Sequence, residues 1–241
     1  MSEQPLTRAE EVARSFRSRR TITWLIMFAI VMFFAGLTSA YVVSASGAYW
    51  VDIKMPRAFA LSTVAIVLSS GAVQMALVAG RKGRKRQVLP WLLITLLLGL
   101  VFTWSQFKGW DQLVTKGNHL VGGLLDIQGE YGVDHTISKD GEQLVLENGD
   151  FYRPSDGPSA RPLNAEMAEQ RNTASSYFYV LTAAHLAHLA FGLLALLVML
   201  YMAFKGRYDQ QGHAGLWAGT VYWHFLGGLW IYLFLFLTIF H

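Results

Sequence analysis

Residues 21–40 read TITWLIMFAIVMFFAGLTSA, twenty consecutive residues without a charged side chain. A helix needs about 20 predominantly apolar residues to cross the hydrocarbon core of a bilayer. Runs without Asp, Glu, Lys or Arg recur along the chain, at residues 22–51, 58–80, 87–107, 177–204 and 210–241. The pattern predicts an all-α polytopic membrane protein with five transmembrane helices, over about 21–44, 57–79, 88–107, 177–204 and 216–240.

The composition excludes several classes of protein. Hydrophobic residues make up 53% of the chain and charged residues 15%, against roughly 25% charged in soluble domains. Five long apolar runs exclude a soluble globular protein, a protein with a single anchor and a transmembrane β-barrel, whose strands alternate over about 10 residues. The chain has no cysteine, so disulfides, thiolate metal sites, iron–sulfur clusters and cysteine nucleophiles are excluded too.

Basic residues beside the spans predict the orientation. With the arm 1–21 inside, the three inside segments carry 5, 5 and 2 Lys and Arg, whereas the first outside loop carries 2. The insert 108–176 carries 6, but long loops count little. We expect a cytoplasmic N-terminus and a periplasmic C-terminus at His241. The formal charge of +4 then needs no nucleic-acid partner.

The densest basic cluster lies in the turn between the second and third spans. Its ordinary role is a topological anchor, and an anionic-lipid site is the alternative. The cluster comprises Arg81, Lys82, Arg84, Lys85 and Arg86.

The insert 108–176 is the place where an extramembrane fold can form. Asn148-Gly149 lies between apolar runs, and Asn-Gly is the strongest short-range signal for a β-hairpin. Pro154, Pro158 and Pro162 follow, which favours an irregular connection. We expect a small outer loop with a hairpin near 142–153, without a second core.

The spans contain no Asp, Glu, Lys or Arg, so a carboxylate proton relay or charge-coupled transporter is not expected. Histidines remain as candidates for chemistry. His185 and His188 are three apart and are expected to share a helix face, and His224 lies in the last span. They are either metal or haem ligands or buried hydrogen-bonding groups. Counted from the span ends, His185 and His224 differ in depth by roughly 10 Å or more, which disfavours a haem between them.

Small and aromatic residues alternate in the last two spans. Close backbone approach favours helix association in lipid, so Gly192 indicates a tight bundle. Gly227 and Gly228 lie between Trp223 and Trp230, which predicts a notch filled by a neighbouring helix or an acyl chain.

The sequence at residues 222–234, YWHFLGGLWIYLF, resembles the last helix of subunit III of haem–copper oxidases. That family's signature is Tyr-Trp-His-Phe followed by Trp a few residues later. Thr182, His185, His188 and Gly192 are similar to the preceding helix of the family, where two histidines three apart precede a glycine. Residues 32–41 (MFFAGLTSAY) and 106–110 (QFKGW) resemble the first helix and the end of the third helix of its five-helix core.

Three departures from the family pattern stand out. Many members carry a glutamate within the first core helix, which is absent here, and an Asp where this chain has Gly227. The two-helix N-terminal hairpin of the longest members has no counterpart, so the resemblance is to the five-span form.

The resemblance implies a non-catalytic subunit of a proton-pumping terminal oxidase that reduces O2 to water, a cytochrome c oxidase in the first place. Such a subunit has no catalytic, cofactor-binding or metal-binding residues of its own. It flanks subunit I and the other oxidase subunits in the bacterial inner membrane, where the catalytic subunits hold haem and copper. It binds phospholipid in a cleft, which we expect between spans 1–2 and spans 3–5, and it supports assembly and sustained turnover.

Several alternatives stay open at this point. Within the family, the alternatives are subunit III of a quinol oxidase and a homologue associated with nitric-oxide reductase. From other classes, the alternatives are a di-histidine membrane cytochrome b and a transporter of neutral solutes. The outer insert is a candidate contact for a periplasmic cytochrome c domain or a respiratory supercomplex.

Overall fold

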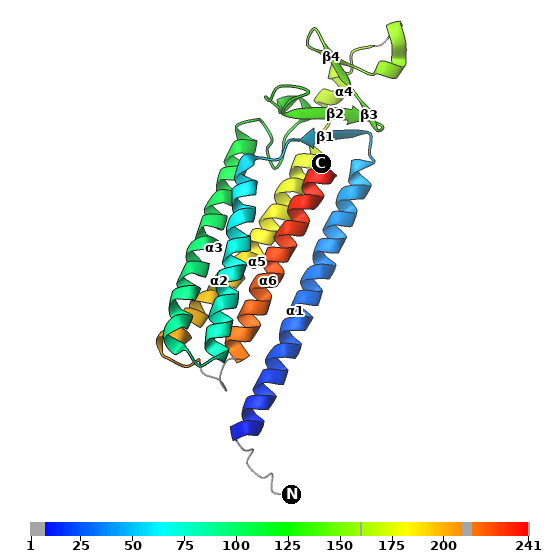
Figure 1. The fold of residues 1–241 in the computed structure, drawn as a ribbon. Coiled ribbons are helices and arrows are strands. Elements are labelled where there is room, and N and C mark those ends of the chain that lie inside the picture. Colours follow the sequence, from blue (N-terminus) through cyan, green and yellow to red (C-terminus); the bar gives the residue numbers. More distant parts are fainter. Residues whose placement is uncertain (1–7, 160, 209–213, 241) are drawn as a thin grey trace, which may run out of the picture. The chain divides into compact units, whose positions relative to one another are not determined.

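The structure of the chain, a computed structural model, describes residues 8–159, 161–208 and 214–240. Residues 1–7 of the expected arm and the C-terminal His241 lie outside these ranges. The described elements, in chain order, are α1 (Arg8–Ala45), β1 (Tyr49–Ile53), α2 (Arg57–Arg81), α3 (Lys85–Val114), η1 (Leu124–Asp126), β2 (His135–Lys139), β3 (Glu142–Gln143), β4 (Val145–Glu147), β5 (Asp150–Tyr152), η2 (Pro154–Ser159), α4 (Asn164–Ala168), α5 (Thr173–Phe204) and α6 (Ala214–Ile239) (Figure 1).

Among the described residues, five helices are long and apolar enough to cross a bilayer, which confirms the predicted number of spans. Most of them extend beyond the predicted limits. The third was expected over 88–107, whereas α3 covers Lys85–Val114. A run without charges marks the part of a helix that lies in hydrocarbon, but a helix continues into the interfacial region wherever its backbone stays hydrogen-bonded.

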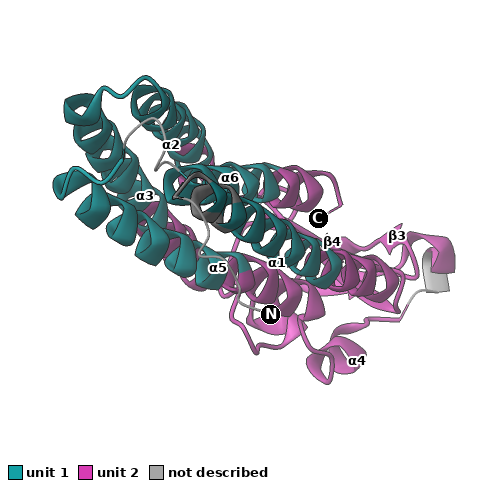
Figure 2. Cartoon of the chain, turned by 90° about the horizontal axis from the view of Figure 1, so that it is seen from below, with its two compact units in different colours: residues 1–33, 62–103, 185–231 teal, residues 34–61, 104–184, 232–241 magenta. Residues whose placement is uncertain are grey.

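The chain divides into two compact units, and each of the five long helices contributes a segment to both (Figure 2). Unit 1 comprises Met1–Phe33, Ser62–Thr103 and His185–Ile231. In it, α6 is hydrogen-bonded to α2 at three levels. Trp223 Nε1 donates to Ser69 Oγ (2.9 Å), Trp230 Nε1 donates to Thr63 Oγ1 (2.9 Å), and His224 Nε2 lies 3.1 Å from Gln74 Oε1.

Unit 2 comprises Phe34–Leu61, Trp104–Ala184 and Tyr232–His241, and it contains the strands. The predicted hairpin is present: β4 pairs with β5 in antiparallel register, with Glu147 opposite Asp150. Asn148 and Gly149 have φ values of 55° and 91°. Positive φ at both central residues is what a type I′ turn requires, and Asn-Gly adopts it readily.

The outer region contains more structure than the hairpin that we expected. Strand β1, in the short loop after α1, pairs with β2 of the insert, and β2 pairs with β3. Trp50, Val51 and Ile53 of β1 and Ile137 of β2 are buried. The sequence does not predict strand β1, because its partner strand lies more than 80 residues away and no local pattern indicates that pairing.

Candidate functional site

His185 on α5 lies in an aromatic environment inside unit 1. The side chain is fully buried, and its ring centre lies 5.8 Å from that of Phe102 and 5.3 Å from that of Trp230. No residue in the described ranges hydrogen-bonds to either ring nitrogen. The histidine therefore acts in this unit as a packing group among rings.

His188 and His224 have different neighbours. His188 is half-buried, and its ring centre lies 6.1 Å from that of Phe33 on α1, while its carbonyl accepts a hydrogen bond from the Tyr222 hydroxyl (3.2 Å). His224 contacts Gln74 on α2. His185 and His188 are neighbours on α5, as residues three apart on a helix are, but their rings pack against different side chains.

The three histidines thus sit in three separate environments. Within residues 8–159, 161–208 and 214–240, no group of three or more His, Cys, Asp and Glu is placed to hold a metal ion. This arrangement gives no support to the metal or haem reading of His185, His188 and His224.

Glycines of α5 and α6 allow close packing at specific points. A Cβ at Gly192 would lie 2.7 Å from Leu226 Cδ1, and one at Gly227 would lie 3.1 Å from Ser70 Oγ. A neighbouring helix thus fills the notch at Gly227. Gly228 is exposed and has no atom within 4 Å of such a Cβ, so no described residue of this chain fills the notch there.

The basic turn lies between α2 and α3, where Gly83 adopts a left-handed conformation (φ 68°). All five side chains of the cluster are exposed, and none forms an ion pair within the described part of the chain. The residues are Arg81, Lys82, Arg84, Lys85 and Arg86.

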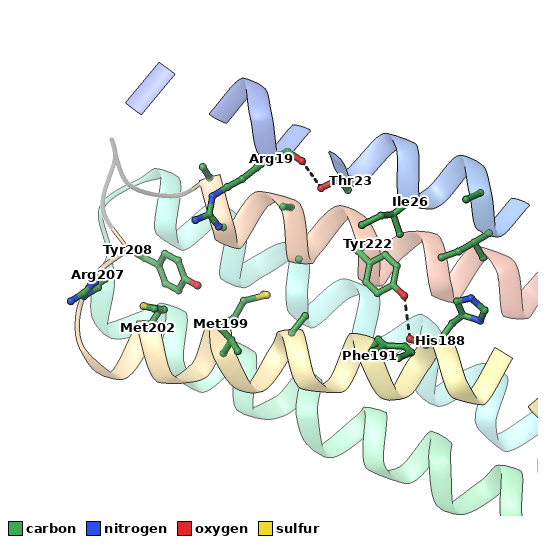
Figure 3. Close-up of a pocket in the computed structure, with 18 residues that line it drawn as sticks. Arg19, Thr23, Ile26, His188, Phe191, Met199, Met202, Arg207, Tyr208 and Tyr222 are labelled. Atoms are coloured by element: carbon green, nitrogen blue, oxygen red, sulfur yellow. Dashed lines mark hydrogen bonds between the residues drawn. The ribbon is translucent and has the colours of Figure 1, made fainter. Parts of the chain in front are cut away.

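A groove of about 980 Å³ lies in unit 1, formed by α1, α5 and α6 (Figure 3). Figure 3 shows Arg19, Arg207 and Tyr208 toward one end of the groove and His188 toward the other. Apolar side chains such as Ile26, Phe191 and Met199 line the length between them. The groove therefore has a polar end and an apolar body.

The position of this groove corrects the expected grouping of helices. We expected a cleft between spans 1–2 and spans 3–5, but α2 is hydrogen-bonded directly to α6. The groove instead separates part of α1 from α5 and α6. Of its lining residues, sequence reasoning had singled out only His188 as a site residue. An available signal was missed: Arg19 and Arg207 flank charge-free runs on the same predicted side of the membrane.

Tyr208 follows α5 and lies beside Arg19. Burial raises the pKa of Tyr208 to about 12, while the positive charge of Arg19 acts in the opposite direction. Its hydroxyl therefore stays protonated at neutral pH and is able to donate a hydrogen bond.

Comparison with known proteins gives consistent matches. Residues 163–241 match the family model described as Cytochrome c oxidase subunit III. The chain is 42% identical over 71 residues to cytochrome c oxidase subunit 3 of Synechocystis. This alignment covers 29% of this chain and 30% of that protein.

Longer alignments cover most of the chain. It is 23% identical over 215 residues to cytochrome bo(3) ubiquinol oxidase subunit 3 of Pseudomonas aeruginosa, covering 88% of this chain and 79% of that protein. It is 24% identical over 213 residues to cytochrome c oxidase subunit 3 of Corynebacterium diphtheriae, covering 85% and 80%. The motif residues of α5 and α6 lie inside the matched C-terminal region, and the longer alignments extend the similarity to subunit 3 of cytochrome c and ubiquinol oxidases over most of the chain.

Proposed function

We propose that the chain is the non-catalytic subunit III of a proton-pumping terminal oxidase that reduces O2 to water, in the first place a cytochrome c oxidase. The observation that carries this proposal is the family match over residues 163–241, which contains His185, His188 and the Trp223–Trp230 segment. The haem and copper belong to partner subunits, subunit I foremost. This chain supports their assembly and sustained turnover.

The family-motif residues act in packing. Trp223 and Trp230 tie α6 to α2 through their indole N–H groups. His185 packs on Phe102 and Trp230. A rigid α2–α6 pair gives the catalytic subunit a fixed surface, which fits a role in assembly.

The groove between α1, α5 and α6 supports a role in lipid retention. Its body is lined by apolar side chains along membrane-spanning helices, where the surrounding solvent is acyl chains. An unfilled groove would forfeit dispersion contacts, so a bound phospholipid is the ligand that this surface favours.

We also propose an orientation of the chain in the membrane. The arm 1–21 lies in the cytoplasm, spans 1–3 fall within residues 22–107, and the insert 108–176 and the C-terminus are periplasmic, in a bacterial inner membrane. Spans 4–5 fall within residues 177–241. The insert contains eleven Asp and Glu against six Lys and Arg, which suits a basic periplasmic partner such as a cytochrome c domain.

A quinol oxidase is the second candidate. It is favoured by the similarity to the ubiquinol oxidase subunit of Pseudomonas aeruginosa, which extends over 88% of this chain. Both candidates predict the same role for this subunit, because the electron donor is bound by other subunits.

One purification tests both. The full chain, tagged at its C-terminus, is isolated from native membranes in mild detergent. Co-purification of polypeptides that carry haem and copper, and that consume O2, is expected. Oxidation of reduced cytochrome c by the complex assigns the first candidate, and oxidation of ubiquinol assigns the second. Isolation without any haem-bearing polypeptide would overturn the proposal.

A further inference from the structure

We infer that the loop that follows α3, residues 117–125, inserts its apolar side chains into the interfacial layer of the adjacent leaflet and anchors the insert to the bilayer. The partner of this surface is lipid, at the level where headgroups meet acyl chains. The anchor goes beyond the proposed function and depends only on the membrane spans that flank the insert.

The 117–125 loop is an apolar segment within a polar insert. It reads GNHLVGGLL and contains no Asp, Glu, Lys or Arg, whereas the insert 108–176 contains eleven acidic and six basic residues. Leu120, Val121 and Leu125 expose 51%, 73% and 41% of their surfaces. Exposed apolar side chains that gather on one segment mark a surface for another protein or for a membrane.

The backbone of the loop is prepared for an environment with little water. Four of its carbonyl groups accept hydrogen bonds from residues around the start of α5. With the donor first, the pairs are the Tyr179 hydroxyl and Asn118 (2.9 Å), the Ser175 hydroxyl and His119 (2.8 Å), the Ser176 hydroxyl and Leu120 (2.7 Å), and the Asn172 N–H and Gly122 (2.9 Å). Backbone groups without partners are costly in hydrocarbon, so this loop is able to approach it.

These hydrogen bonds also set the depth of the loop. Ser176 directly precedes the charge-free run 177–204, and the interfacial layer outside the hydrocarbon is about 5–8 Å thick on each side. A loop bonded to Ser175 and Ser176 therefore lies within that layer. The ring of Tyr179 lies 6.1 Å from that of Trp110, and Tyr and Trp are enriched at this level of a membrane.

The loop continues an exposed side of α5. Ser176, Val180 and Ala183 have the spacing of one helix stripe, and Val180 and Ala183 are exposed. The carbonyl of Leu120 is bonded to Ser176, at the end of this stripe nearest the insert. Because the stripe belongs to a membrane span, the surface that continues it meets lipid rather than an aqueous partner.

The anchor would hold the insert at a fixed height. Lys116, which precedes the loop, forms a 2.6 Å ion pair with Asp134 beside β2. On the other side of the loop, the N–H of Leu124 donates to the carbonyl of Gln170 (3.1 Å), shortly before α5. A loop fixed in the interface thus restrains both β2 and the segment that enters α5.

Nitroxide labels test the position of the loop directly. The chain has no cysteine, so the full-length protein is labelled at one introduced cysteine and reconstituted in phosphatidylcholine liposomes. The variants are Val121→Cys in the loop, Val145→Cys on β4 and Leu68→Cys within α2, all at exposed positions. Electron paramagnetic resonance with power saturation compares collisions with O2, which concentrates in hydrocarbon, and with nickel–EDDA, which stays in water. The ratio at Val121 should exceed that at Val145 severalfold and stay below that at Leu68.

A second set of variants tests whether the apolar side chains hold the loop in place. Leu120→Asp/Val121→Asp is combined with a label at Leu125→Cys, and the ratio at this label should fall toward that at Val145. Val145→Asp/Leu146→Asp adds the same charge at exposed positions of β4 and should leave the label at Leu125 unchanged. Far-UV circular dichroism checks that both double variants keep the helix content of wild type.

Two results would overturn the inference. A ratio at Val121 equal to that at Val145 would place the loop in water. Low accessibility of Val121 to both reagents would show that protein covers the loop, a second copy of the chain in these liposomes. Neither result affects the oxidase assignment, which co-purification decides separately.

Discussion

The indole N–H of Trp223 donates a 2.9 Å hydrogen bond to the hydroxyl of Ser69, and both side chains are buried between α6 and α2. The same hydroxyl donates to the carbonyl of Ile66 at 2.8 Å. The hydroxyl proton of Ser69 is thereby directed at the backbone of α2, and a lone pair of the hydroxyl oxygen accepts the hydrogen bond from Trp223. This bond joins the family-motif tryptophan to a helix that lies outside the matched C-terminal region.

Ser69→Ala should therefore weaken the α2–α6 contact. A buried hydrogen bond contributes about 1 kcal/mol in water, and interhelical bonds in membranes average about 0.6 kcal/mol. We expect a loss of about 1 kcal/mol in the free energy of unfolding, measured by denaturant titration in detergent micelles. Ser39→Ala, at an exposed position of α1, is the control and should change little. Equal stability of both variants would show that the Trp223 bond contributes nothing.

Gly227 and Gly228 form a matched pair for a second test. A side chain at Gly227 meets Ser70 and Ile66 of α2, whereas one at Gly228 meets no atom within 4 Å. Gly227→Leu should push α6 from α2 and cost about 1–3 kcal/mol, as overpacking does. Gly228→Leu should leave the stability of the isolated chain unchanged. Thermal unfolding of the two purified variants compares them, and a larger loss for Gly228→Leu would contradict the packing of Gly227 against α2.

Cofactor content gives a third prediction. His185, His188 and His224 have separate neighbours, and the described residues contain no cluster suited to a metal. The chain expressed alone should therefore bind neither haem nor copper, as shown by its visible spectrum and by metal analysis. One haem per chain, lost on His185→Leu or His224→Leu, would favour the membrane cytochrome b instead.

A fourth prediction concerns His188, which lies toward the apolar end of the groove. It lines the groove, so His188→Leu should change lipid retention while the haem content per catalytic subunit in the assembled complex stays the same. Phe102→Leu, which alters the buried surroundings of His185, is a control outside the groove lining. A fall in haem content with the complex still assembled would contradict a packing role for His188.

The number of spans, the hairpin and the similarity to oxidase subunit III could be predicted because each depends on a local pattern. Charge-free runs indicate hydrocarbon depth, and Asn148-Gly149 carries the dihedral angles of its turn. The packing partners depend on the rotation of each helix about its axis. One residue turns a side chain by about 100°, which is why Gly227 meets α2 and Gly228 does not. The same limit explains why the different ring partners of His185 and His188 were not predicted.

Long-range proximity could not be predicted for a related reason. Strand β1 pairs with β2 across more than 80 residues, and Arg19 lies beside Tyr208 across nearly 190. Such contacts depend on the positions of whole elements, and neither segment contains a local signal for its partner. For Arg19 and Arg207, the sequence predicts only that they lie on the same side of the membrane, and it does so through the distribution of basic residues.

The last prediction concerns acid and the outer insert. Glu142 on β3 accepts hydrogen bonds from the Ser155 hydroxyl (2.7 Å), the Ser155 backbone N–H (2.9 Å) and Arg153 Nε (2.8 Å). The Ser155 hydroxyl, followed by the Arg153 guanidinium, holds the pKa of Glu142 below its ordinary value of 4.5. The unfolded segment thus binds a proton at a higher pH than the folded one. The stabilisation is present above about pH 4.5 and is lost as pH falls through the folded pKa.

Hydrogen exchange of residues 142–155 at pH 7 and near pH 3 measures this dependence, after correction for the intrinsic exchange rate. Wild type should lose protection in acid. Glu142→Gln should start with less protection at pH 7 and lose less of it, because its amide does not titrate; Lys139–Glu166 and Lys116–Asp134 still contribute some acid sensitivity. Glu147→Gln, at an exposed position without an ion pair among the described residues, should behave as wild type. An unchanged pH profile in Glu142→Gln would show that this carboxylate does not hold β3 to the segment that begins η2.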